Sequence, residues 1–299
     1  MFTGHLLKLI RILPAFIFYL FSDLLRFVAV HLIRYRREVV TENIQNSFPN
    51  KSSQEIQEIA KKQYTNFCDV LVEPLIAYSF NKKHWQKRVE LSGIDPIRKY
   101  LNEGTAIVLV AGHLANWEWG GFALRSALGY PLEFLYKDIE HGALNKFMLS
   151  LRSHKGQVGI EKDKSMREFI KRRKEPRILA LVSDQIPAIG TDKTWINFLS
   201  QETAFYQGAE RTAVAFQYPV FYAEVVRIKR GQYKVQYTEI AKPPFDRGVD
   251  YSITEKFASR LEQSIKLYPE SYLWSHKRWK YTKEEEEQVL MNSLKTTRS

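Results

Sequence analysis

Cysteine is nearly absent from this sequence: Cys68 is the single one in 299 residues. One cysteine excludes an intramolecular disulfide framework and every zinc or iron–sulfur site built from several cysteines. Packing must therefore stabilise the fold, and a reducing compartment suits the chain best.

Acidic residues are also in deficit, with 33 Asp+Glu against 45 Lys+Arg and a formal net charge of +12. Hydrophobic residues make up 44% of the chain, enough for a real core, which excludes disordered and fibrous architectures. The positive charge favours anionic partners. A non-enzymatic basic protein that binds membranes or nucleic acid would fit this charge. However, basic and aromatic residues are scattered and no RNA-binding signature is present, so we expect no nucleic-acid partner.

Charge is missing from residues 12–21, which read ILPAFIFYLF. This run is half of the roughly 20 residues that a spanning helix needs. Asp23 and Arg26 interrupt it, but if both are tolerated on a tilted helix the apolar stretch continues to the basic cluster at 34–37. We predict a membrane anchor over residues 1–33, either spanning or deeply interfacial.

Two other interpretations of the apolar segment are a cleaved signal peptide and an ordinary core helix. A signal peptide would use Lys8 and Arg11 as its basic region, but residues 22–24 offer no small-x-small cleavage site. The cluster at 34–37 slightly outweighs the two earlier cations, which favours a cytoplasmic body. We therefore expect an inner-membrane protein with its catalytic domain on the cytoplasmic face.

The rest of the chain has no internal repeats and no long linker rich in Pro, Gly or Ser, which predicts one compact domain over 34–282 and a charged tail over 283–299. Residues 53–80 have a helical rhythm that Pro74 must bend or break. Strand-like runs follow at 106–111, 132–136, 178–182, 220–228 and 233–240. Helical stretches are predicted at 116–128, 144–154, 165–174, 209–216 and 251–267. This alternation indicates an α/β sheet.

The most informative segment, residues 110–121, joins the end of the first strand to the start of a helix. Ligands of open α/β sheets bind beyond the carboxyl ends of strands, so His113 stands where chemistry usually occurs. Asn116 is a suitable N-cap, and Glu118 then falls in the first helical turn, where the helix dipole favours a carboxylate.

The spacing of His113 and Glu118 restricts their geometry. Five residues on a continuous helix leave two side chains about 140° apart, so His113 must lie in a non-helical turn for the pair to meet. Such a couple would fix the imidazole tautomer and raise its basicity toward a hydroxyl. The alternative is a buried histidine satisfied by backbone and an ordinary helix-start acid, and spacing alone does not decide between them.

Several blocks together are similar to one known family. They are NIQNSFP at 43–49, GHLANWE at 112–118 with glycines at 120 and 121, VSDQ at 182–185, the Gly-Ala helix at 208–220 and YLWSHKRWK at 272–280. Across almost its whole length the chain resembles the lipid A biosynthesis acyltransferases, the late lauroyl and myristoyl transferases of the glycerolipid acyltransferase-like group. The resemblance implies an anchoring helix followed by one domain with a central mixed sheet flanked by helices.

The resemblance also implies a reaction: transfer of a fatty acyl chain from an acyl carrier protein thioester to a hydroxyl of a lipid A precursor, without metal or bound cofactor. His113 would be the general base, Glu118 would orient and polarise it, and the acceptor would attack the thioester directly. The absence of a G-x-S-x-G motif agrees, and Cys68 in a helical run suits a buried role. A lysophospholipid, an ornithine-type lipid or another glycolipid is the alternative acceptor.

Five further residues are predicted to contact substrate. Asp184 and Gln185 follow an apolar strand, and Asp184 would bind or orient the acceptor sugar unless it only forms a turn. Lys277 and Arg278, between two tryptophans, would meet headgroup phosphates or the acidic carrier protein. Lys137 stands where the family often has arginine, so it would supply a point charge instead of a planar guanidinium. Asn197–Ser200 and Trp279 also depart from the family pattern, so acyl length does not carry over.

Overall fold

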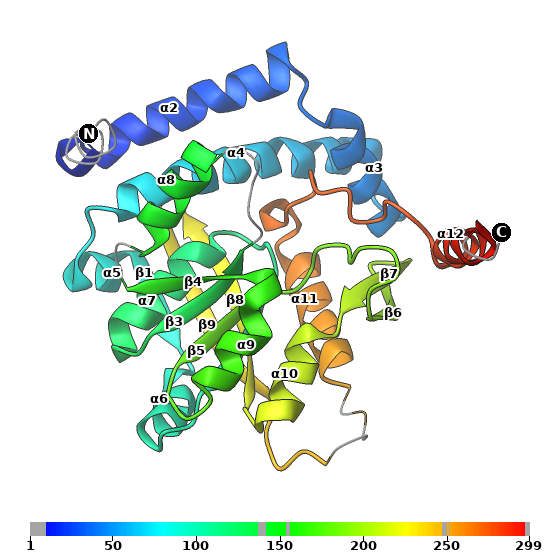
Figure 1. The fold of residues 1–299 in the computed structure, drawn as a ribbon. Coiled ribbons are helices and arrows are strands. Elements are labelled where there is room, and N and C mark those ends of the chain that lie inside the picture. Colours follow the sequence, from blue (N-terminus) through cyan, green and yellow to red (C-terminus); the bar gives the residue numbers. More distant parts are fainter. Residues whose placement is uncertain (1–9, 137–141, 154–155, 247–249, 251, 297–299) are drawn as a thin grey trace.

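The computed structural model describes residues 10–136, 142–153, 156–246, 250 and 252–296. Lys137 lies outside these ranges, so its predicted contact stays a prediction. The described chain forms a mixed α/β fold with helices on both sides of a central sheet (Figure 1). The fold class predicted from the alternation of strands and helices is confirmed.

Seven strands form the central sheet, in the order β1-β9-β8-β2-β5-β3-β4. Their bounds are Val89–Ser92 (β1), Ile107–Ala111 (β2), Leu132–Tyr136 (β3), Gln157–Glu161 (β4), Ile178–Val182 (β5), Val220–Lys229 (β8) and Gln232–Ala241 (β9). Within this sheet β8 pairs antiparallel with β9, and the other neighbouring strands pair parallel. A separate antiparallel hairpin is made by Lys193–Phe198 (β6) and Gln201–Tyr206 (β7). The five strands predicted from sequence all exist, whereas β1, β4, β6 and β7 were not predicted.

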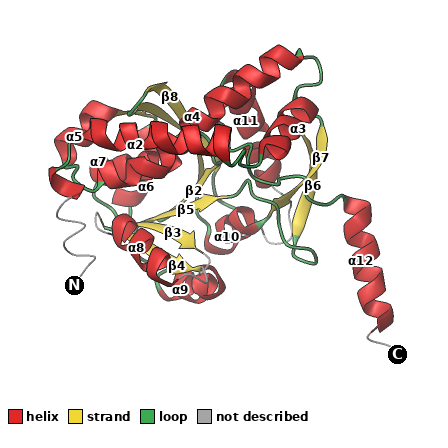
Figure 2. Cartoon of the chain, turned by 90° about the horizontal axis from the view of Figure 1, so that it is seen from above, coloured by secondary structure: helices red, strands yellow, loops and turns green. Residues whose placement is uncertain are grey.

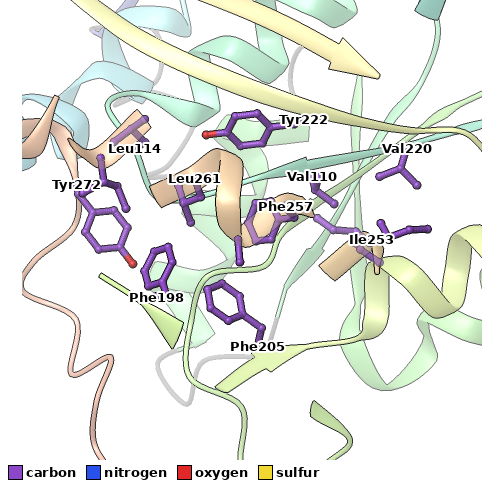
Figure 3. Close-up of a cluster of buried hydrophobic side chains, with 14 of the residues drawn as sticks. Val110, Leu114, Phe198, Phe205, Val220, Tyr222, Ile253, Phe257, Leu261 and Tyr272 are labelled. Carbon is purple, nitrogen blue, oxygen red and sulfur yellow. The ribbon is translucent and has the colours of Figure 1, made fainter. Parts of the chain in front are cut away.

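Both faces of the sheet are covered, because the central strands are apolar on each side. In β2, Val108 and Val110 join one core, while Ile107 and Leu109 join the other. The first core is packed by α3 (Arg37–Ser47), α9 (Ser165–Lys171), α10 (Gly208–Phe216) and α11 (Ile253–Leu267). The second is packed by α2 (Ala15–Phe27), α5 (Lys82–Arg88), α6 (Ile94–Asn102) and α7 (Trp117–Leu128). Figure 3 shows the first core where Phe257 and Leu261 of α11 approach Val110.

The long helix α4 (Ser53–Ala77) begins at a capping box in which Ser52 and Glu55 satisfy each other's backbone amides. Such a box fixes a helix start. Pro74 does not break the helix, which continues three residues beyond it. The proline removes one backbone N–H donor, and the hydrogen bonds resume after it, because the Tyr78 amide donates to the Pro74 carbonyl at 3.1 Å.

Helix α2 lies against α4 rather than apart from the body (Figures 1 and 2). A short π-helical segment, Val28–Leu32, extends it. Among the described residues one helix, Ala15–Leu32, is long and apolar enough to cross a membrane, and only 17% of it is buried. Composition thus permits the predicted anchor.

At the other terminus, α12 (Lys283–Thr296) projects from the body (Figure 2). Its first turns are tied back by a buried ion pair between Glu286 and Lys193, and by the Gly190 amide, which donates to Glu286 at 2.8 Å. The start of the tail is therefore part of the folded structure.

Candidate active site

His113 and Asp184 meet because of strand register. Parallel strands β2 and β5 are neighbours, and Ala111 is aligned with Val182. His113 and Asp184 each follow two residues later, so they leave the same edge of the sheet side by side. The His113 backbone amide donates to Asp184 Oδ2 at 2.9 Å, and His113 Nδ1 lies 2.6 Å from Asp184 Oδ1.

The turn that carries His113 is shaped by packing on both sides. A Cβ on Gly112 would lie 2.5 Å from the Leu261 side chain of α11, so a larger residue there would force that side chain to shift. Ala115 has a φ of 47°, which reverses the chain before α7 begins. Asn116 caps that helix, as predicted, by accepting from the Trp119 amide at 2.8 Å. His113 therefore lies in a non-helical turn, as the spacing required.

Electrostatics decides which imidazole nitrogen is free. Burial of Asp184 opposes its ionisation, but the charge and hydrogen bonds of His113 outweigh burial and lower the pKa of the carboxyl group. An ionised carboxylate only accepts hydrogen bonds, so His113 Nδ1 carries a proton, and in the neutral imidazole the lone pair is then on Nε2. The Gln185 amide nitrogen lies 3.4 Å from Nε2. This tautomer is the one a general base needs.

The predicted contact between Glu118 and His113 is not present. Glu118 lies in the first turn of α7, as expected, but its Oε1 accepts from Arg152 of α8 (Gly142–Ser153), with the Nε contact at 3.1 Å. Asp184 reaches Nδ1 from the adjacent strand, and Glu118 instead faces α8. Among the described residues no group hydrogen-bonds the other Glu118 oxygen, which is buried. The orienting role assigned to Glu118 passes to Asp184, and any catalytic role of Glu118 stays a prediction.

A pocket of about 270 Å³ contains His113, Glu118 and Arg152. Its apolar lining includes Phe67, Val70, Leu71, Pro74, Trp117 and Leu273. The Trp117 ring meets the imidazole edge-on with centroids 4.6 Å apart. A mostly apolar hollow with a few converging polar groups is typical of a small-molecule site.

Backbone hydrogen bonds from the C-terminal segment hold the His113 turn in place. The Leu273 amide donates to the His113 carbonyl at 3.1 Å, and the Ala115 amide donates to the Ser271 carbonyl at 2.8 Å. Asn43 donates to the carbonyls of residues 274 and 276, at 2.8 and 2.9 Å. Three blocks that lie far apart in the sequence thus form one site.

Arg278 is not on a substrate-facing surface. It is 2% exposed, donates to the Ala204 carbonyl and lies 4.5 Å from the centre of the Phe205 ring. Its charge also helps to lower the pKa of Asp184. The prediction that it meets headgroup phosphates directly is therefore wrong, because the segment turns it inward. Lys277 is exposed, and its predicted contact stays a prediction.

Two residues of the site were not predicted. Arg152 lies on a helix that the sequence indicated, but nothing in its spacing linked it to Glu118. His276 accepts from the Ile186 amide at 3.3 Å and so fixes the turn after Asp184. Burial lowers the pKa of His276 to about 4, which keeps it neutral and able to accept. Its position in the block at 272–280 was the only available signal.

A family model described as bacterial lipid A biosynthesis acyltransferase matches residues 2–281. The chain belongs to this family. A search of curated proteins finds no match to this chain. Membership establishes acyl transfer of the lipid A type as the activity, and an acceptor of the lipid A class. Within the described residues of this lipid A acyltransferase, no cluster of three His, Cys, Asp or Glu could hold a metal ion. The absence of a cofactor remains a prediction.

The Glu118–Arg152 pair of this lipid A acyltransferase gives a testable expectation. Arg152→Met should raise the KM for the lipid substrate about 10- to 100-fold, because the loss of one hydrogen bond to a charged group weakens binding by about that factor. The pH dependence of kcat should stay unchanged. Glu118→Gln keeps an acceptor for Arg152 and should have a smaller effect. Steady-state kinetics on both purified variants, with circular dichroism as the folding control, make the comparison. Wild-type KM in Arg152→Met would remove the pair from the substrate site.

Proposed function

We propose that this enzyme transfers a fatty acyl chain from an acyl carrier protein thioester to a hydroxyl of a lipid A precursor, in a late acylation step. One observation carries the mechanism: His113, oriented by a buried Asp184, shares a largely apolar pocket with Glu118 and Arg152. A base that takes a proton from a hydroxyl and a hollow that accepts an acyl chain are the two things that the reaction needs.

In the proposed reaction the acceptor hydroxyl hydrogen-bonds to His113 Nε2. As its oxygen attacks the thioester carbonyl, the proton passes to Nε2, and Asp184 stabilises the imidazolium. The tetrahedral intermediate then breaks its C–S bond, and the imidazolium returns the proton to the leaving thiolate. General-base help contributes about 10²–10⁴ in rate, and positioning of the two lipids supplies the remainder.

Direct attack, without an acyl-enzyme, is supported by the state of the single cysteine. Cys68 is 1% exposed, and burial raises its pKa to about 11. A buried thiol of high pKa is a poor nucleophile. Cys68 also points away from the pocket residues of α4, because it belongs to the buried face next to Asp69 and Val72.

The other polar groups near the base would hold the substrates. Arg152 is the pocket cation and would face anionic charge, Gln185 would hydrogen-bond the acceptor beside Nε2, and the exposed Lys277 would meet a headgroup phosphate or the acidic carrier protein. Attachment to the cytoplasmic face of the inner membrane is supported by the exposed apolar helix and the basic cluster at 34–37.

Purified enzyme tests the function directly. Acyl carrier protein thioesters and coenzyme A thioesters of several chain lengths are offered with a lipid A precursor or with a lysophospholipid, and products are weighed by mass spectrometry. We expect transfer from the carrier protein to the lipid A precursor, matched by a missing acyl chain in lipid A from cells that lack the gene. Transfer only to lysophospholipid, with unchanged cellular lipid A, would overturn the proposal.

A further inference from the structure

The exposed side of α2 is a continuous apolar stripe. Phe16, Leu20, Leu24 and Phe27 follow each other at helical spacing and are each at least 50% exposed. Phe18 and Ser22 are the buried residues of α2, and they lie on the opposite side. Soluble monomeric proteins rarely expose such a stripe, and an exposed apolar patch of this kind marks a site that contacts a protein or a membrane.

A network of charged and polar side chains fixes the inner side of α2 to the body. Ser22 donates to Asp69 of α4 at 2.6 Å. One Arg230 nitrogen bridges Asp23 and Asp69, at 2.8 and 2.6 Å. Tyr19 donates to the buried Glu73 at 3.0 Å. These contacts occupy both central turns of the helix, so α2 and α4 behave as one unit.

This attachment conflicts with a helix that crosses the bilayer. Asp23 stands at the middle of Ala15–Leu32, and a spanning α2 that kept its partners would carry Asp69 and Arg230 to the bilayer centre. A spanning α2 that left them would take Asp23 into hydrocarbon without its Arg230 partner and would remove the Ser22 donor from fully buried Asp69. Charges at membrane depth are costly in either case.

We propose that α2 lies flat in one leaflet of an anionic lipid bilayer, with its apolar stripe toward the acyl chains and both of its ends on the same side of the membrane. Charge at the two ends complements anionic headgroups, because Arg11 is exposed before α2 and Arg34 and Arg37 are exposed after it. An amphipathic helix with cations near the interface is typical of this orientation.

The flat orientation also fixes the position of the pocket relative to the membrane surface. Glu73 accepts from Tyr19 of α2 and from Asn116 next to the His113 turn, so the membrane helix and the site are linked through one side chain. Leu71, which lines the pocket, is 52% exposed on α4. A lipid in the same leaflet can therefore enter sideways.

Cysteine labelling distinguishes the two orientations. In a Cys68→Ser background, Arg11→Cys and Glu38→Cys place thiols before and after the helix, and Glu103→Cys marks the body as a control. In inverted inner-membrane vesicles, a membrane-impermeant maleimide should label all three without detergent to within about twofold. Labelling of Arg11→Cys only after detergent, with Glu38→Cys labelled before it, would overturn the proposal. Acyl transfer is assayed separately, so failure of one proposal does not mask the other.

A second measurement tests the apolar stripe. Leu20→Gln with Leu24→Gln should weaken binding to vesicles of phosphatidylglycerol and phosphatidylethanolamine at least tenfold. Leu267→Gln, a matched change at a leucine 68% exposed on α11, should leave binding unchanged. Equal loss from the control, or no loss from the pair, would contradict the assignment of this face to the bilayer.

Discussion

His113→Ala is expected to reduce kcat for acyl transfer by about 10²–10⁴, because it removes the group that takes the proton from the acceptor. The loss should appear in kcat/KM to a similar degree, since the proton moves only in the transition state. Single-turnover transfer from a labelled thioester on purified, detergent-solubilised protein measures it.

The alanine change also leaves the buried Asp184 without its main partner, which could destabilise the fold. His113→Gln is the matched control, because its amide can still donate to Asp184 but cannot act as a base. Both variants should lose kcat to a similar degree, while the glutamine variant keeps wild-type thermal stability. Wild-type kcat in His113→Gln would show that the imidazole is structural.

Asp184→Asn is expected to cost a comparable factor of about 10²–10⁴ in kcat. Its amide can turn an N–H toward His113 Nδ1, which moves the imidazole proton to Nε2 and blocks the lone pair that the reaction needs. Combined with His113→Ala it should add little, because the two side chains act as a unit. Additive losses in the double variant would separate them.

The same residue predicts the sign of a pH effect on stability. The folded-state pKa of Asp184 is lowered, so its ionised form contributes stability above the unfolded value of about 4. That contribution is lost as pH falls through the lowered folded value. Asp184→Asn should remove this part of the acid sensitivity, which thermal unfolding between pH 3 and 7 would reveal.

The sequence indicated both residues of the proposed catalytic pair but gave His113 the wrong partner. His113 and Asp184 each follow an apolar strand, and both were assigned to the ligand edge of the sheet. The order of strands in a sheet is a tertiary property, so the sequence did not reveal that β2 and β5 are neighbours. Glu118, which is close to His113 in the sequence, was therefore predicted to be its partner. The prediction that Arg278 contacts headgroup phosphates was wrong for a related reason. Its aromatic neighbours indicated an interface, whereas in the fold they belong to the core.

The strands that were missed are short or polar. In the hairpin of β6 and β7, residues 199 and 200 have φ values of 52° and 64° without the glycine or asparagine that usually marks such a turn. The apolar run at 12–21 was evident, but its orientation depends on Asp23 meeting Arg230, about 200 residues later. Patterns along the chain describe local preference, whereas these contacts depend on topology.

The support that Leu273 gives to the His113 turn has a consequence for synthesis of the protein. About 160 residues separate these two hydrogen-bonded positions, so at typical translation speeds the second emerges roughly 10–30 s after the first. The apolar helix that meets the lipid is made first, and the segment that completes the base is made nearly last. A nascent chain can therefore reach the membrane long before it can catalyse, and a ribosome that stalls midway leaves no active fragment behind.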